Sequence, residues 1–237
     1  ALLVATAWLT AAVTATFGLG GGIILLAVLL NVMTPTMAIP VHGVLQLGAN
    51  GFRSWLMRHD VLRGEWLWFL PGAVLGVALA SVVVVELPTR WLAFALAAFL
   101  LWIVWVPKPT ARALPPRRFA LVGAAAAFLT MFVGATGPLV AAFLPPERHG
   151  RLATVATHGA CMTAQHLFKV VAFGLLGFSF ADWLPLVVAM LASGFAGTFS
   201  GRLLLERLPE RLFRTAFRWL LTALAVKLLL DALRTAA

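Results

Sequence analysis

The chain alternates between long apolar runs and short polar connections, which divide its 237 residues into about eight blocks. The blocks cover residues 1–33, 36–57, 66–86, 91–106, 119–145, 151–177, 182–205 and 212–233. Leu, Ala and Val occupy all faces of these blocks, whereas membrane β-strands alternate apolar and polar positions. A helix needs about 20 apolar residues to cross a hydrocarbon layer. The pattern therefore predicts an all-α integral membrane protein with about eight transmembrane helical segments.

Composition supports this class and excludes a soluble domain. Hydrophobic residues make up 62% of the chain and charged residues 11%, and the mean hydropathy is +0.99. The formal net charge of +10 comes from Lys and Arg in the short connections, which indicates membrane topology and not a nucleic-acid partner. The single cysteine, Cys161, lies in an apolar block, so we expect no disulfide and no cysteine-based metal site.

The two halves of the sequence match each other at a constant shift of 116 residues. The aligned pairs are Thr14 and Thr130, Gly18 and Gly134, Gly21 and Gly137, His42 and His158, Gly43 and Gly159, Phe52 and Phe168, and Arg53 and Lys169. Further along, a shift of 121 aligns Gly76 with Gly197. We interpret the chain as a tandem duplication: a first membrane repeat over 1–106, a basic cytoplasmic connection over 107–118 and a second membrane repeat over 119–237.

The first segment of each repeat contains a glycine cluster, at 18–22 and at 134–138, that is unsuited to a helix interior. We expect these segments to be broken and to turn back within the membrane. If each broken segment passes through the membrane an even number of times, the four basic connections lie on the same side of it. This agrees with the rule that short cytoplasmic loops carry an excess of Lys and Arg. Each repeat then crosses an odd net number of times. The halves therefore have opposite orientations, the inverted-repeat plan of many secondary transporters.

Irregular backbone at membrane depth is tolerated where it lines a cavity, and helix N-termini there favour an anion. The candidate binding groups around the breaks are Thr14, Gly20, Gly21, Gly22, Thr130, Thr136 and Gly137. The alternative is that the glycines only allow close helix packing, as small residues commonly do in membranes.

Polar side chains recur at helical spacing in the segment after each break. One stripe carries His42, Gln46, Asn50 and Arg53, and the second carries His158, Met162, His166 and Lys169 with Gln165 beside it. The two stripes could line a pathway, and histidine, with an ordinary pKa of about 6.5, could carry protons along it. One alternative is that the histidines are neutral and hydrogen-bonded between helices. Zinc ligation is a second alternative, but no Cys or carboxylate lies beside these histidines to favour it.

Lys169 lies well inside its block and is the principal candidate for a substrate charge partner, because a charge at the centre of a spanning helix is costly. Arg53 lies nearer a block end and could instead extend to the interface. No carboxylate lies in the middle of any block, which argues against an acidic cation site. The chain has no nucleotide-binding loop and no hydrolytic constellation, so we expect no enzymatic activity and no cofactor.

The segment 17–22 (Phe-Gly-Leu-Gly-Gly-Gly), its counterpart 133–138 (Val-Gly-Ala-Thr-Gly-Pro) and the run 156–159 (Ala-Thr-His-Gly) with His166 and Lys169 resemble the TauE/SafE family of membrane anion exporters. The resemblance covers nearly the whole chain. It implies export of sulfite, sulfoacetate or related organosulfonates across a bacterial inner membrane. The sequence departs from the family pattern at 40–42 (Pro-Val-His), which leaves the substrate open among these anions.

The resulting hypothesis is a secondary transporter working by alternating access. In this hypothesis a small anion binds between the two halves of the protein, and the lipid bilayer surrounds the helices. Protons are the candidate coupling ion. Three alternatives remain: a non-transporting membrane subunit or scaffold, a transporter of another small anion, and a membrane enzyme with a metal at the histidines. The sequence predicts no particular oligomeric state.

Overall fold

The computed structural model describes residues 1–17, 20–84, 89–106, 114–144, 149–205 and nine isolated positions between 215 and 233. All regular structure in these ranges is helical. The helices are α1 (Leu2–Phe17), α2 (Gly21–Val32), α3 (Pro35–Leu56), α4 (Arg63–Val84), α5 (Thr89–Trp105), α6 (Phe119–Val133), α7 (Gly137–Ala141), α9 (Arg151–Leu175) and α10 (Leu184–Leu205), with short 3₁₀ turns η1 (Arg58–Asp60), η2 (Pro116–Arg118) and η3 (Ala181–Trp183).

Each of the first seven predicted blocks corresponds to one helix or to one broken pair of helices. By length and apolarity, three described stretches can cross a membrane: Arg63–Val83, Pro116–Val133 and Ala181–Phe199. Helices α3 and α9 have 22 and 25 residues, about 33 and 37 Å at 1.5 Å per residue, and carry the polar stripes. The block 212–233 lies mostly outside the described residues. The all-helical class is confirmed for the described chain, and the count of eight segments stays a prediction.

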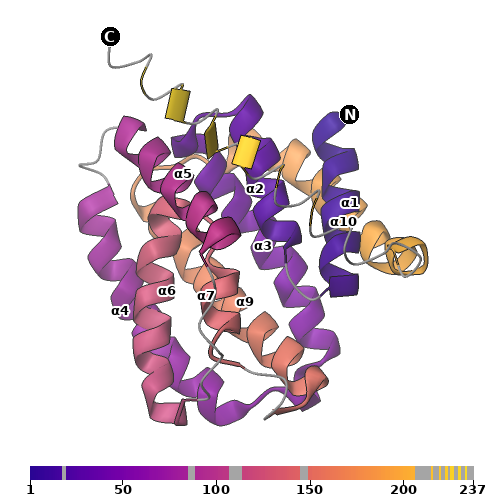
Figure 1. Ribbon diagram of the computed structural model, residues 1–237, viewed down its shortest axis with the longest axis vertical. Helices are drawn as coiled ribbons and strands as arrows, with labels where there is room; N and C mark the ends of the chain where they lie inside the picture. Colours follow the sequence, from indigo (N-terminus) through magenta and orange to yellow (C-terminus); the bar gives the residue numbers. More distant parts are fainter. Residues whose placement is uncertain are drawn as a thin grey trace.

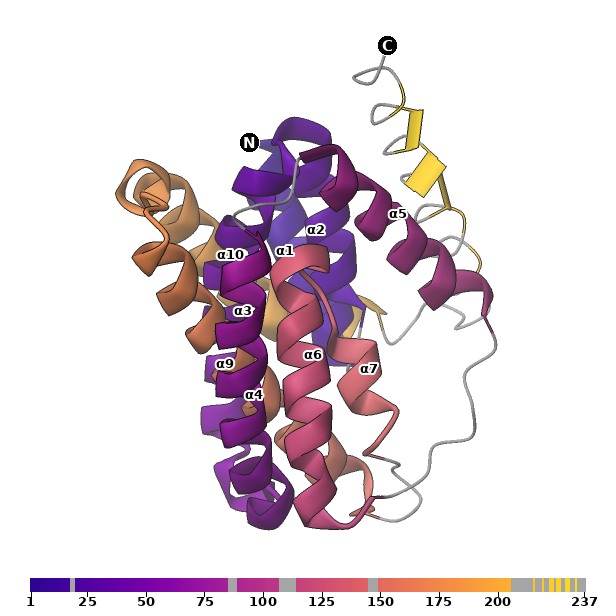
Figure 2. The ribbon, with the colours of Figure 1, turned by 90° about the vertical axis from the view of Figure 1, so that its left-hand side faces the viewer.

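Both predicted glycine breaks interrupt a helix. The backbone turns at Gly20 with φ 103° and at Gly134 with φ 76°, a conformation that favours glycine because it has no Cβ. Gly18 lies outside the described residues. Figure 1 shows α1 running from the end that carries the N-terminus to about mid-height, and Figure 2 shows α6 rising from the opposite end before α7 turns back toward it. The two broken segments therefore enter the molecule from opposite ends.

Helices α4 and α6 pack together on one side of the molecule, α1 and α10 on the other, and α3 and α9 lie between them (Figure 1). Small residues allow these contacts, as is usual for helices in membranes. Gly76 of α4 lies against the backbone carbonyl of Ala124 in α6, and Gly197 of α10 lies against the backbone carbonyl of Trp8 in α1. A Cβ at either glycine would overlap the facing backbone.

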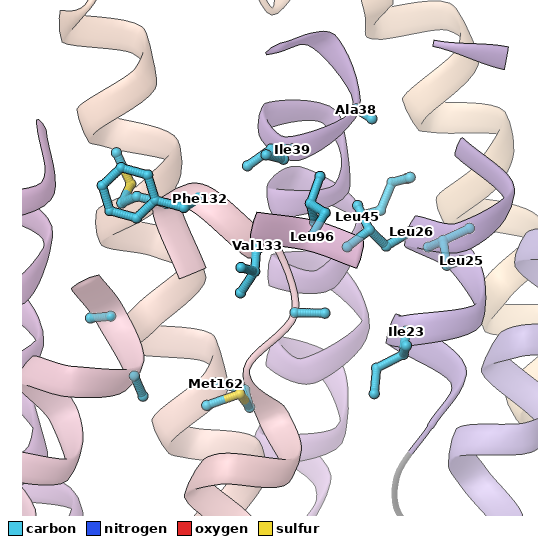
Figure 3. Close-up of a cluster of buried hydrophobic side chains, with 14 of the residues drawn as sticks. Ile23, Leu25, Leu26, Ala38, Ile39, Leu45, Leu96, Phe132, Val133 and Met162 are labelled. Atoms are coloured by element: carbon cyan, nitrogen blue, oxygen red, sulfur yellow. The ribbon is translucent and has the colours of Figure 1, made fainter. Parts of the chain in front are cut away.

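The apolar core lies where the two broken segments meet. Figure 3 shows Leu26 of α2, Leu45 of α3 and Leu96 of α5 in one cluster, with Val133 near the end of α6. A Cβ at Gly134 would lie 2.8 Å from a methyl carbon of Leu26, so α2 packs directly on the second break. The two breaks are thus held against each other at the centre of the fold.

The outward face of α4 is as apolar as its core-facing side. Leu75, Leu79 and Val82 are exposed by 55%, 56% and 75%, whereas Phe69 and Ala73 of the same helix are fully buried. An exposed aliphatic surface of this kind requires an apolar surrounding, because water would not solvate it. The helix therefore faces lipid.

Basic connections gather at the end opposite the N-terminus (Figure 2). There the backbone N–H of Leu62 donates to the hydroxyl of Thr157 at 2.8 Å, and a Cβ at Gly64 would lie 3.4 Å from Pro116 of η2. The connection 107–118 is described from 114 onward. The described parts of three basic connections therefore share one side, as an even number of passes in each broken segment predicts.

Candidate anion site

The polar stripe of α3 forms a hydrogen-bonded relay that ends on a cation. The Asn50 amide donates to the Gln46 side-chain oxygen at 3.1 Å and to the Gln46 carbonyl at 2.8 Å. Arg53 then donates through Nη2 to Asn50 Oδ1 at 2.6 Å. The spacing of three and four residues brings these groups onto one helix face. The relay orients the Arg53 guanidinium, as the predicted stripe requires.

Histidines 42 and 158 bind the breaks in the same way. His42 Nε2 lies 2.9 Å from the carbonyl oxygen of Gly22, and His158 Nε2 lies 3.1 Å from that of Gly137. A carbonyl only accepts, so each imidazole donates from Nε2, and its Nδ1 is an acceptor in the neutral ring. Arg53 Nη2 lies 3.5 Å from His158 Nδ1. This contact connects the two polar stripes across the α3–α9 interface.

His166 lies in the same buried region. Its ring centroid is 5.8 Å from that of His42, with the rings at 79°. Its Nδ1 is buried without a hydrogen-bond partner among the described residues, whereas the His42 ring also faces the backbone of Gly134. Buried polar atoms are normally satisfied, by protein or by ordered water. The Nδ1 atom of His166 is consequently a place where water or a ligand can bind.

Lys169 lies deep in the interior, as its place in the sequence indicates, but it does not line the polar pocket. It is fully buried, and its Nζ donates to the carbonyl oxygen of Gly134 at 3.1 Å, which also accepts from Thr130 Oγ1 at 3.0 Å. Its Cε lies so close to Gly43 that a Cβ there would approach to 2.8 Å. Lys169 thus stabilises the end of α6, where a positive charge complements the carbonyl groups.

Gln165 and Thr136 also brace the second break. Gln165 Nε2 donates to Thr136 Oγ1 at 2.9 Å, and Thr136 Oγ1 donates to the Ala126 carbonyl at 3.1 Å. Both side chains are fully buried. The pair ties α9 to α6 through the irregular residues between α6 and α7.

A polar pocket lies between the two breaks and the two stripes, and it contains most of the predicted site. Its lining residues are Thr14, Gly20, Gly22, Ile23, His42, Gln46, Asn50, Arg53, Ala135, Gly137, Pro138, His158, Met162 and His166. The space open to the centres of water molecules is about 40 Å³, room for roughly three waters or one small oxyanion. Arg53 is the one charged side chain on the described wall. The start of α2 also lines the pocket through Gly22 and Ile23, and the Ile23 N–H donates to the Gly20 carbonyl at 3.1 Å.

Five predicted site residues lie outside this lining. Gly21 lines the adjacent apolar pocket, and Thr130, Thr136, Gln165 and Lys169 line neither pocket. Four lining residues were missing from the predicted site: Ile23, Ala135, Pro138 and Met162. The sequence contained a signal for each of them: Ala135 and Pro138 lie within the second glycine cluster, Ile23 follows the first, and Met162 lies on the second stripe.

The apolar pocket lies between α1, α2, α3 and α10 and is the larger of the two, with about 90 Å³ open to water-sized molecules. It shares Thr14, Gln46, Asn50 and Arg53 with the polar pocket. The rest of its described wall consists of Ala7, Thr10, Ala11, Gly21, Leu25, Leu45, Ala49, Phe52, Leu56, Met190, Leu191, Gly194, Phe195 and Thr198. The side chains common to both pockets form the boundary between them.

A lipid-facing helical fold around a buried pocket with one cation and no carboxylate on its described wall has the features of a membrane transporter for anions. The chain belongs to the TauE/SafE family: the family model described as "Sulfite exporter TauE/SafE" matches residues 3–228. Comparison with curated proteins and with solved structures returned no match. Family membership makes the chain a multi-pass membrane transporter of sulfite-like anions and not an enzyme.

Proposed function

We propose that this protein is a secondary transporter that exports sulfite, sulfoacetate or a related organosulfonate, with the anion bound in the polar pocket against Arg53. The observation that carries the proposal is that Arg53 alone supplies a charge to the described wall of that pocket. Asn50 and Gln46 fix its direction, and a guanidinium matches a planar or tetrahedral oxyanion through two parallel donors. Thr14 and the first residues of α2 also line the pocket, at a helix N-terminus, which favours an anion.

Several supporting residues hold the pocket in shape. Lys169 and Thr130 stabilise the end of α6, while Gln165 and Thr136 fix the break that follows. Gly21 allows α2 to begin against α1. In this proposal these side chains position the binding groups and leave direct contact with the anion to Arg53 and its neighbours.

Alternating access between two inverted repeats, over 1–106 and 119–237, is the proposed mechanism. Matched contacts support the duplication. The Gly76–Ala124 contact has its counterpart in Gly197–Trp8, at shifts of 121 and 116 residues. The entry of the two broken segments from opposite ends supports the inversion (Figures 1 and 2). The anion site lies at the junction of the halves, where rocking of one against the other exposes it to each side in turn.

The proposed membrane is the bacterial inner membrane, with the basic connections in the cytoplasm. Proton coupling is a further part of the proposal. His166 carries a buried Nδ1 without a partner among the described residues, and its ring lies against that of His42 beside the site. A proton taken up at either imidazole would add a positive charge next to the bound anion, which would couple the two binding events.

The direct test is anion binding by purified protein in which Arg53 is replaced by Met. Loss of a hydrogen bond to a charged group, worth about 1.5 to 3 kcal/mol, weakens binding by roughly tenfold to a hundredfold. Ligand-dependent thermal stability measures this, because a ligand that binds only the folded protein raises its melting temperature. The panel is sulfite, sulfoacetate, sulfate, taurine and chloride.

Arg58→Met is the matched control, because Arg58 lies in η1 with its side chain over Trp55, outside both pockets. It removes the same charge close by in the chain and should leave the anion-induced shift unchanged. Efflux of radiolabelled sulfite from proteoliposomes should likewise be reduced in Arg53→Met and unchanged in Arg58→Met, relative to the parent protein. Equal binding and efflux in Arg53→Met and the parent protein would exclude Arg53 as the anion contact. No response to any anion in the parent protein would favour a non-transporting subunit.

A further inference from the structure

Two glycines that the aligned halves pair with each other, Gly43 and Gly159, lie at the interface of α3 and α9. Each faces the cation of the other half. A Cβ at Gly159 would lie 3.3 Å from Arg53 Nε and 3.8 Å from Arg53 Nη2. A Cβ at Gly43 would lie 2.8 Å from Lys169 Cε and 3.7 Å from Lys169 Nζ. The two contacts are copies of one arrangement, in which a helix glycine of one half leaves room for the cationic side chain of the other.

These two glycines differ from the ones that bring helix backbones together. A Cβ at Gly76 or Gly197 would overlap a backbone carbonyl of the facing helix. At Gly159 the nearest backbone atom of α3, the Ser54 nitrogen, would lie 3.8 Å away, which is an ordinary contact. The backbones of α3 and α9 would therefore accommodate alanine, and only the Arg53 side chain would not. Glycine is a poorer helix former than alanine, so its place inside α9 agrees with a need for this space.

Contacts from both helices fix the Arg53 guanidinium. On its own helix, Asn50 Oδ1 accepts a hydrogen bond from Nη2 at 2.6 Å. On α9, His158 Nδ1 lies 3.5 Å from Nη2, and the space left by Gly159 adjoins Nε. A methyl group at position 159 would push Nε away by a few tenths of an ångström. Because the guanidinium is planar and its donors form a rigid fork, this push redirects both terminal nitrogens.

We infer that Gly159 is a positioning residue for the anion: the space beside it determines where the Arg53 guanidinium lies, and so how well Arg53 meets a ligand in the polar pocket. Gly159 itself lines neither pocket. The corresponding space at Gly43 holds Lys169, which lies outside the polar pocket and donates to the Gly134 carbonyl. The inference rests on the proposed anion site and adds a residue of the second half that controls it.

Replacement of Gly159 by Ala tests the inference on the full chain in lipid nanodiscs, with sulfite and sulfoacetate as probes. The charge of Arg53 remains and only its direction changes, so affinity should fall by about threefold to tenfold, less than on loss of the whole hydrogen bond. Without anion, the melting temperature should stay within about 3 °C of the parent value, because only the end of one side chain moves. Gly174→Ala is the matched control on α9. A Cβ there would make an ordinary contact, 3.7 Å from Phe180, so the affinity for both probes should be unchanged.

A double-mutant comparison determines whether Gly159 acts through Arg53. In the Arg53→Met protein the guanidinium is gone, so Gly159→Ala should cause no further loss of the residual affinity. In the Arg53→Lys protein the side chain is unbranched and bends around a methyl group, so Gly159→Ala should weaken binding by less than about twofold. A residue that only packs α9 against α3 would give the same loss in all three backgrounds.

The outcomes distinguish the inference from the proposed function. Equal affinities in Gly159→Ala and Gly174→Ala, with binding that still depends on Arg53, would overturn the inference and leave the proposed function intact. An equal loss of affinity in the Arg53→Met background, or a Gly159→Ala protein that melts several degrees below the parent or does not fold, would assign Gly159 to helix packing and also overturn the inference. Absence of Arg53-dependent binding for both probes would overturn the proposed function itself, and the inference with it.

Discussion

Replacement of Gly21 by Ala tests whether the start of α2 holds the site together. A Cβ at this position would overlap the backbone carbonyl of Thr10 and the hydroxyl of Thr14, and would lie 2.9 Å from the Thr10 carbonyl carbon. The Thr14 hydroxyl could rotate away, although it would then lose its hydrogen bond to Thr10 at 2.9 Å. The Thr10 backbone lies inside α1 and cannot move alone. The methyl group must therefore push α2 away from α1.

The expected cost follows from overpacking at a rigid contact, which typically destabilises by about 1 to 3 kcal/mol. Alanine favours a helix over glycine by about 1 kcal/mol, so the net loss of unfolding free energy is at most about 2 kcal/mol. The same shift displaces Gly22, whose carbonyl accepts from His42. Anion affinity should fall as well, because the start of α2 and His42 both line the polar pocket.

Gly51→Ala is the control, because a Cβ there would make only an ordinary contact, 3.8 Å from Thr163 Cγ2. It should leave stability unchanged or raise it by up to about 1 kcal/mol through helix propensity. Thermal unfolding of both variants in the same detergent, with and without sulfite, measures the two effects together. A Gly21→Ala protein as stable as Gly51→Ala, with unchanged sulfite response, would refute the close approach of α2 to α1.

Two further substitutions probe the second break. Lys169→Met removes the donor to the Gly134 carbonyl, but Thr130 still donates to that oxygen, so the free energy of unfolding should fall by about 1 to 2 kcal/mol and anion affinity by less than in Arg53→Met. Thermal unfolding with a sulfite titration measures both effects. A full loss of affinity at unchanged stability would instead place Lys169 in contact with the substrate. Gly137→Ala brings a Cβ to 3.3 Å from His158 Nε2 and should shift that ring by a few tenths of an ångström. We expect several-fold weaker anion binding at nearly unchanged melting temperature, and parent-like affinity would show that the His158 position does not matter to the site.

Helix positions followed from the sequence because local signals determined them. Apolar run lengths located the helices, and the glycine clusters located the breaks at Gly20 and Gly134, where positive φ excludes most other residues. The stripe from His42 to Arg53 also followed, since a period of 3.6 places its members on one face whatever the helix packs against.

Side-chain direction across helices did not follow from the sequence. Lys169 and Arg53 occupy equivalent positions in the aligned halves, yet Lys169 bonds the Gly134 carbonyl while Arg53 lines both pockets. Gln165, beside the second stripe, reaches Thr136 and not the pocket. The apolar pocket cannot be predicted from the sequence for the same reason: its wall combines residues of four helices, and each residue is ordinary in its own helix.

The difference between the halves bears on how a duplicated transporter handles one substrate. In the proposed mechanism, repeats with similar backbones give the two access states comparable energies, which rocking between them requires. Equivalent cations at Arg53 and Lys169 would offer an anion two competing sites. Here the first half presents Gln46, Asn50 and Arg53 to the pocket, whereas Met162 takes the place equivalent to Gln46 and Lys169 donates to the Gly134 carbonyl outside the pocket. In the proposed mechanism the anion has one preferred contact, Arg53, in both access states, and exchange of the Arg53 and Lys169 side chains should destroy binding instead of moving it to the second half.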